Sequence, residues 1–146
     1  MKKDLIENII KNYILIKENK NGISPLILGW IKRFFPNTKD ESDVSWCSIG
    51  LINAFKEFLN IDVTLYKVTP AAKSWVNYGK KLLDNSKAEY GDLIIFNRGT
   101  SWQGHIAIFL RYNKVNGNPI VLGFNQSDAL TIEEMDKSKI FQINTW

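Results

Sequence analysis

The spacing of apolar residues changes along this chain, from a helical period in its first part to short strand-like runs after residue 90. Helical spacing predicts helices over 4–17 and 24–35, and a third that contains Cys47 and ends at Leu59. Apolar runs bounded by turn residues predict strands over 92–97, 105–112, 119–125 and 140–144. Helices followed by strands are typical of an α+β fold, so we expect N-terminal helices packed on an antiparallel β-sheet.

The segments between these elements carry weaker patterns. Residues 61–66 alternate weakly, which predicts a short strand or an extended connector. Residues 69–79 begin with Thr-Pro and end with Gly, which predicts a small helix, and Asn116-Gly117 predicts a hairpin turn. The sequence contains no internal repeat or linker, and 146 residues can bury a substantial core. We therefore expect a single domain over residues 1–146.

Composition excludes several kinds of site. One cysteine rules out an intrachain disulfide and a cysteine-based zinc site, and one histidine leaves little for any other metal, so we expect neither a metal nor a cofactor. The net charge of +4 comes mostly from lysines spread along the chain. Such charge indicates either a solvated surface or attraction to a polyanion, but no nucleic-acid-binding motif accompanies it, so nucleic acid is not an expected partner.

The N-terminal residues 1–11 open with lysines, but polar residues interrupt the apolar ones at helical intervals. This pattern predicts an amphipathic helix instead of a secretory signal. No segment approaches the roughly 18 apolar residues of a membrane span, so we expect no membrane insertion. The sequence thus predicts synthesis in the cytoplasm without a signal peptide. If the protein acts outside the cytoplasm, it must first be released or secreted.

Cys47 lies where a nucleophilic cysteine would be placed. Asp43 and Ser45 are both good N-cap residues, and either choice puts Cys47 in the first turn of its helix. The unsatisfied N–H groups and the helix dipole favour a thiolate there, which is the nucleophilic form. We expect this thiol to face an open cleft. The alternative is an ordinary cysteine packed in the core.

His105 and Asn125 could complete a catalytic group. Alternation along the second strand puts His105 on one face with the small Ala107, which would leave room for the Cys47 helix. In the next strand, Gly123 similarly opens space beside Asn125. Asn125 could then orient the imidazole while the other ring nitrogen faces Cys47. A lone histidine is otherwise more often a hydrogen-bonded structural residue.

Several segments carry a family resemblance: DVSWC at 43–47, AKSW at 72–75, GDLIIF at 91–96, GHIAIF at 104–109 and VLGFNQS at 121–127. In these segments the chain resembles the NlpC/P60 and CHAP group of papain-like cysteine peptidases and amidases. The resemblance implies a papain-like fold, with Cys47 as nucleophile, His105 as base and Asn125 as orienting residue. Gln126 takes the third role if the strand register slips by one.

The resemblance also implies an oxyanion hole, formed by the backbone N–H of the cysteine and commonly by an upstream tyrosine. The only tyrosine before Cys47 is Tyr13, in the first predicted helix, so the second donor stays unassigned.

The implied activity is hydrolysis of an amide bond in bacterial cell-wall peptidoglycan. A phage-type endolysin fits the size and charge, and so does an antibacterial effector, which would also imply an immunity or export partner. Two alternatives stay open. One is a papain-like acyltransferase or deamidase that acts on a lipid or protein. The other is a non-catalytic binding domain of the same fold, in which Cys47 would be buried and inert.

Overall fold

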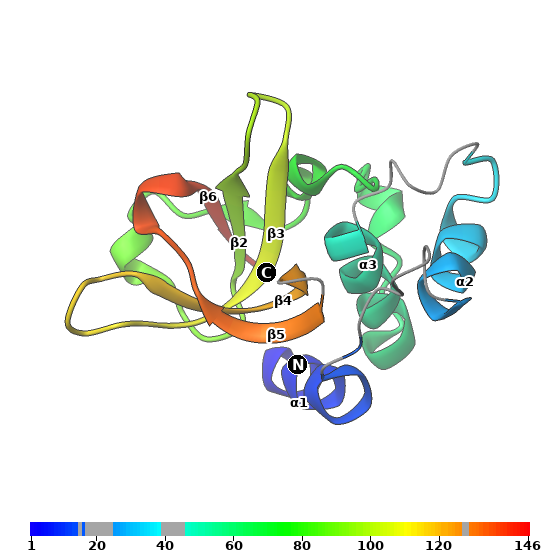
Figure 1. Ribbon diagram of the computed structural model, residues 1–146, viewed down its shortest axis with the longest axis horizontal. Helices are drawn as coiled ribbons and strands as arrows, with labels where there is room; N and C mark the ends of the chain where they lie inside the picture. The colour runs from blue at the N-terminus through cyan, green and yellow to red at the C-terminus, as the bar shows by residue number, and fades with distance from the viewer. Residues whose placement is uncertain (15, 17–24, 39–45, 127–128) are drawn as a thin grey trace.

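The computed structural model describes residues 1–14, 16, 25–38, 46–126 and 129–146, and these form an α+β domain (Figure 1). Its α-helices come first and its sheet second, as the sequence predicts. The helices are α1 (Lys2–Tyr13), α2 (Pro25–Phe34) and α3 (Trp46–Leu59). The strands are β1 (Lys80–Lys81), β2 (Leu93–Asn97), β3 (Gly104–Tyr112), β4 (Pro119–Gln126), β5 (Ala129–Glu134) and β6 (Ile140–Thr145).

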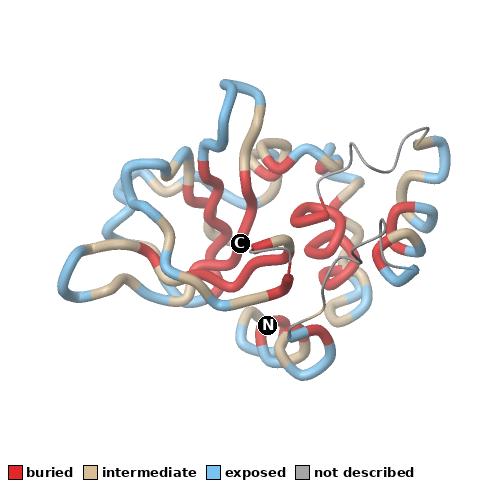
Figure 2. Tube along the Cα trace, in the orientation of Figure 1, coloured by how far each residue is buried: buried red, intermediate tan, exposed pale blue. Residues whose placement is uncertain are grey.

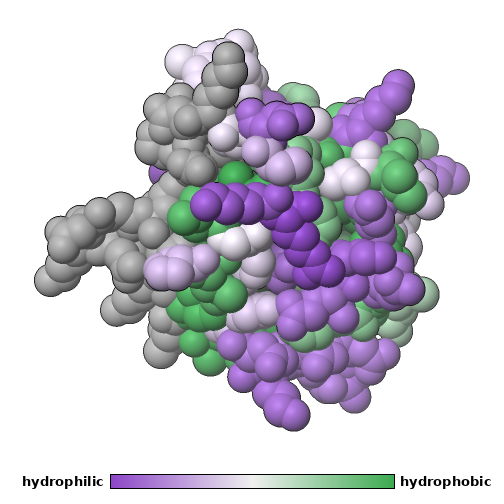
Figure 3. All heavy atoms as spheres, turned by 90° about the vertical axis from the view of Figure 1, so that its right-hand side faces the viewer, coloured by the Kyte–Doolittle hydropathy of each residue, from purple (hydrophilic) through white to green (hydrophobic). Residues whose placement is uncertain are grey.

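Helix α3 is the central helix of the domain. It packs against β3 and β4 on one side, while α1 and α2 lie against it on others (Figure 1). Every residue from Trp46 to Phe55 is buried, as Figure 2 shows, and only the last turn reaches solvent. Polar side chains cover much of the molecular face on the helical side (Figure 3). No helix among the described residues is long and apolar enough to cross a membrane.

The six strands form one antiparallel sheet in the order β1-β6-β2-β3-β4-β5. The predicted hairpin joins β3 to β4, and Gly117 supplies the positive φ of its turn. Strand β6, from the end of the chain, inserts between β1 and β2. Strand β5 was not predicted from the sequence, and it places Thr131 beside Gly123 of β4.

Two hydrophobic clusters lie on opposite faces of the sheet. Ile106 and Ile108 of β3 share a cluster with α3, whereas Ala107 and Phe109 belong to a second cluster with residues of β2, β4 and β6. The expectation that α3 approaches the Ala107 face is therefore wrong. The large branched side chains on the other face cover more apolar surface, and α3 packs there.

One connection departs from the sequence prediction and another confirms it. Residues 61–66 form no strand: a 3₁₀ turn, Val63–Tyr66, begins at Asp62, whose carboxylate accepts from the backbone N–H of Thr64 at 3.1 Å. This local bond favours a turn over a strand. The small helix predicted within 69–79 is present as the 3₁₀ helix Ala72–Asn77. The expected caps of α2 and α3, Ser24 and Asp43 or Ser45, lie outside the described residues.

Candidate active site

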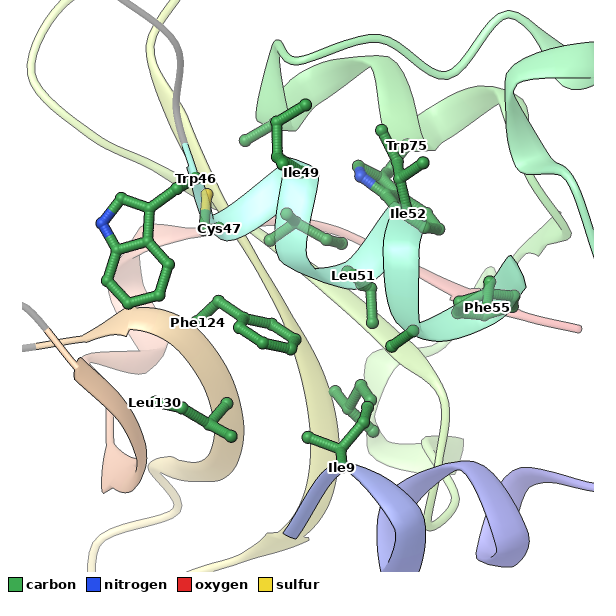
Figure 4. Packing of buried hydrophobic residues seen from close by; sticks show 14 of the residues in the cluster. Ile9, Trp46, Cys47, Ile49, Leu51, Ile52, Phe55, Trp75, Phe124 and Leu130 are labelled. Atoms are coloured by element: carbon green, nitrogen blue, oxygen red, sulfur yellow. The ribbon is translucent and has the colours of Figure 1, made fainter. Parts of the chain in front are cut away.

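Cys47 occupies the first turn of α3, as predicted, but its side chain does not face solvent. The residue is 0% exposed and belongs to the main hydrophobic cluster. Figure 4 shows it at the start of α3, close to Trp46 and above Phe124 of β4. The expectation of a thiol in an open cleft is therefore wrong for this structure, because the sulfur lies within the main hydrophobic cluster.

Phe124 fixes the start of α3 on the sheet. Its ring lies so close to Gly50 that a Cβ at that position would stand 2.5 Å from ring carbons. The edges of Trp30 and Trp46 meet the same ring, with centroid distances of 5.7 and 6.3 Å. The absence of a side chain at Gly50 thus allows the Cys47 turn to approach the end of β4.

A buried hydrogen-bond chain also holds the first turn of α3. The indole N–H of Trp75 donates to Ser48 Oγ at 2.9 Å, and Ser48 Oγ donates to the carbonyl of Thr69 at 2.6 Å. Trp75 is fully buried, so this chain satisfies polar groups that would otherwise be costly inside the core. It also brings together two of the segments that carry the family resemblance, those around Cys47 and Trp75.

His105 lies near the start of β3 and is 4% exposed. It pairs with Phe96 of β2 in the sheet, and the two rings stack with centroids 6.3 Å apart. Its Nε2 lies 3.0 Å from Oε1 of Gln126. Its Nδ1 is buried and has no hydrogen bond of normal geometry among the described residues. The Cys47 side chain is nevertheless near enough to the ring to influence the pKa of His105.

Gln126 determines which ring nitrogen carries the proton. Its amide nitrogen donates to the carbonyl oxygen of Thr131 at 2.8 Å and also reaches the Thr131 hydroxyl at 3.2 Å. A carbonyl only accepts, so the amide nitrogen must face Thr131 and the amide oxygen must face His105. Nε2 of the neutral ring then donates to Gln126, and Nδ1 is left as an unprotonated acceptor. Nδ1 of this tautomer can therefore accept a proton from a neighbouring group.

The electrostatics of His105 reflect these neighbours. Burial lowers its pKa, but the hydrogen bond and charge of Cys47 and the bond to Gln126 together outweigh that effect. The pKa of His105 is therefore raised above its usual value of 6.5. A raised pKa in a buried imidazole indicates that the Cys47–Gln126 environment stabilises the imidazolium.

Asn125 does not hold the imidazole. The hydrogen bond expected from it is made by Gln126, the alternative that a one-residue register slip predicts. The pairing of β4 with β5 shifts between Gly123 and Gln126, and Asn125 within this shift has a φ of 57°. The bulge reverses the alternation of side chains, so Gln126 takes the face on which Asn125 was expected.

Tyr13 is not placed as an oxyanion donor. Its hydroxyl donates to the Glu57 carboxylate, near the other end of α3 from Cys47, and Asn53 donates to the same oxygen at 3.0 Å. Burial and the neighbouring Glu57 raise the pKa of Tyr13 to about 12, so the phenol stays protonated at neutral pH. This network stabilises the packing of α1 on α3.

A cavity of about 280 Å³ opens beside the imidazole. His105, Asn125 and Gln126 line one part of it, and the described lining residues do not include Cys47. The cavity therefore borders the imidazole and its Gln126 partner. Its rim carries charges of both signs: Arg98, Glu133, Asp136 and Lys139.

Within the described part of the chain, no three acidic, histidine or cysteine side chains are grouped to hold a metal ion. Neither a protein-family model nor a curated protein sequence matches this chain.

Proposed function

We propose that the chain is a cysteine-dependent amide hydrolase of the papain-like NlpC/P60 type. Cys47 is the nucleophile, His105 the base and Gln126 the residue that orients the base. The observation that carries the proposal is the meeting of three elements at one point: the first turn of α3, the start of β3 and the end of β4. A helix N-terminus behind the sulfur and an unprotonated Nδ1 before it favour formation of a thiolate.

The reaction proceeds by acyl transfer. The Cys47 S–H proton moves to Nδ1 of His105, and the thiolate attacks the carbonyl carbon of the amide. The C–N bond then breaks as the imidazolium gives its proton to the departing amine, leaving a thioester on Cys47. Water, deprotonated by the same nitrogen, attacks the thioester and releases the carboxylic acid with the free thiol.

The Nε2–H bond to Gln126 supports both proton transfers. Because it uses Nε2, it holds the imidazole and leaves Nδ1 to accept the proton. A neutral amide also avoids a full negative charge beside the ring. The backbone N–H of Cys47 at the start of α3 would bind the oxyanion, since first-turn N–H groups lack partners within the helix.

The substrate we propose is an amide in the peptide part of peptidoglycan or at its junction with the sugar chain. This assignment rests on the family resemblance and on the basic net charge of +4, which favours an anionic wall polymer. Either a phage-type endolysin or an antibacterial effector would act on this bond after release or secretion.

The test is digestion of isolated peptidoglycan by the purified protein, with mass spectrometry of the released fragments. The matched variant is Cys47→Ser, which keeps the size of the buried side chain. We expect new amine and carboxylate ends with the wild type and none with the variant. Release at similar rates by both proteins would eliminate the thiol mechanism.

A second candidate function is supported by the 0% exposure of Cys47: a non-catalytic binding domain of the same fold. Turnover requires the protein to open around the sulfur, whereas a binding domain does not. Alkylation of the only cysteine, followed by intact mass, measures this opening. Labelling of the folded protein that slows when peptidoglycan fragments are added supports the hydrolase. Labelling only after global unfolding supports the binding domain.

A further inference from the structure

Asn125 has an unusual backbone conformation for its place in the fold. Three non-glycine residues among those described have positive φ: Asn60, Lys67 and Asn125. Asn60 directly follows α3 and Lys67 caps a 3₁₀ helix, and left-handed residues are common at helix ends. Asn125, in contrast, lies inside strand β4, where a φ of 57° interrupts the extended chain.

This conformation adds one residue to β4. Gly123 pairs with Thr131 and Gln126 pairs with Ala129. Between these two pairs β4 advances by three residues, whereas β5 advances by two. An extra residue in one strand is a β-bulge, and it turns the side chains that follow it onto the other face. Without the bulge, Gln126 would point away from the face that Gly123 shares with His105.

Gly123 completes the arrangement by leaving space. A Cβ at Gly123 would lie 2.3 Å from Gln126 Oε1 and 3.0 Å from His105 Nε2. The Gln126 amide therefore lies over the Gly123 backbone to reach the ring. The bulge and this glycine act together, since the first turns Gln126 toward His105 and the second gives its amide room.

We propose that Asn125 is a positioning residue that acts through its main chain: its left-handed conformation places Gln126 on His105. The proposal deepens the function proposed above and depends on it. Asparagine suits the position because it adopts the left-handed region more readily than most residues. Its carboxamide is not required for the contact, because the bond to the ring comes from Gln126.

Substitutions of Asn125 separate the main-chain role from a side-chain role. Asn125→Gly removes the carboxamide but permits positive φ, while Asn125→Val removes it and opposes positive φ. We expect Asn125→Val to cleave peptidoglycan more slowly than Asn125→Gly, by up to roughly the hundredfold that marks the low end of a general-base contribution. If Asn125→Val does not fold, Asn125→Ala takes its place with a smaller loss of the same sign.

The NMR titration of His105, the only histidine, supplies a readout that does not need activity. We expect the midpoint in Asn125→Gly to match the wild type, and the midpoint in Asn125→Val to fall, because the bond to Gln126 that raises it is lost. Equal effects of Gly and Val on the midpoint would overturn the proposal. Absence of cleavage by every protein, with the expected midpoints, would contradict the hydrolase and leave the main-chain role of Asn125 supported.

Discussion

Oε1 of Gln126 lies 3.0 Å from Nε2 of His105, and this contact decides which ring nitrogen of the neutral imidazole carries the proton. The amide cannot turn over without placing its oxygen against the carbonyl of Thr131, to which its nitrogen now donates at 2.8 Å. The β4–β5 hairpin thereby fixes the proton of the neutral His105 ring on Nε2 and leaves Nδ1 unprotonated. Hydrogen positions follow here from the bonding network around Gln126.

Two substitutions of Gln126 test this contact, because they should shift the titration midpoint of His105 in opposite directions. Gln126→Leu removes the acceptor, so the titration midpoint of His105 should fall and cleavage should slow by up to roughly a hundredfold, the low end of a general-base contribution. Gln126→Glu keeps an acceptor and adds a negative charge, so the midpoint should rise. NMR titration of the single histidine measures both. Shifts in the same direction would contradict the role of Gln126.

Cys47→Ala should reverse the pH dependence of stability. In the wild type the pKa of His105 is raised, so its stabilising contribution is complete below pH 6.5 and is lost as pH rises through the raised pKa. Without Cys47, burial becomes the main influence and lowers the pKa, so stability should increase with pH over the same range. Because the cysteine is buried, the variant should also lose about 1 kcal/mol.

Urea unfolding between about pH 5 and 7.5, within the range where histidine titrates, measures both slopes. Cys47→Ser serves as the control for the lost volume. Parallel pH profiles for the wild type and Cys47→Ala would mean that the thiol does not influence His105.

Gly50→Ala should destabilise the protein by about 1–3 kcal/mol, because the added methyl group would overlap the Phe124 ring. It should also slow cleavage, because a shift of α3 away from Phe124 of β4 would move Cys47 away from His105. Gly29→Ala in α2 is the matched control, because no atom lies within 4 Å of its added Cβ. That control should gain up to about 1 kcal/mol from helix propensity. Equal unfolding midpoints for the two variants would contradict the close approach.

Tyr13→Phe should affect stability and spare activity. The Tyr13 hydroxyl donates to Glu57, so its removal should cost about 1–2 kcal/mol of the free energy of unfolding. Cleavage per folded molecule should stay unchanged, because the hydroxyl does not reach the site. A loss of rate without loss of stability would instead identify Tyr13 as the second oxyanion donor.

The sequence was sufficient to predict the helices, most of the sheet and the position of Cys47 in a first turn. Hydrophobic period is a local signal, and α3 ends at Leu59 as that period predicts. The third member of the site was not determined by such signals, because strict alternation selects Asn125 and only the bulge selects Gln126. A bulge depends on the φ of one residue and on its partner strand, and β5 was itself unpredicted.

The burial of Cys47 likewise could not be predicted from its own helix. Helical spacing shows that the residue lies in the first turn, but its burial depends on the main hydrophobic cluster, to which distant parts of the chain contribute. Phe124 belongs to β4, nearly eighty positions further along the chain. Contacts at such separation leave no periodic trace in the sequence, so an exposed and a buried first-turn thiol look alike there.

The most direct test of Cys47 as the nucleophile is the intact mass of the protein, quenched in acid during digestion of soluble peptidoglycan fragments. A thiol mechanism predicts that a fraction of the wild type carries an acyl fragment as a thioester on Cys47, with no such adduct on Cys47→Ser. Fragment release without any adduct on wild-type Cys47, at a rate that Cys47→Ser matches, would contradict it.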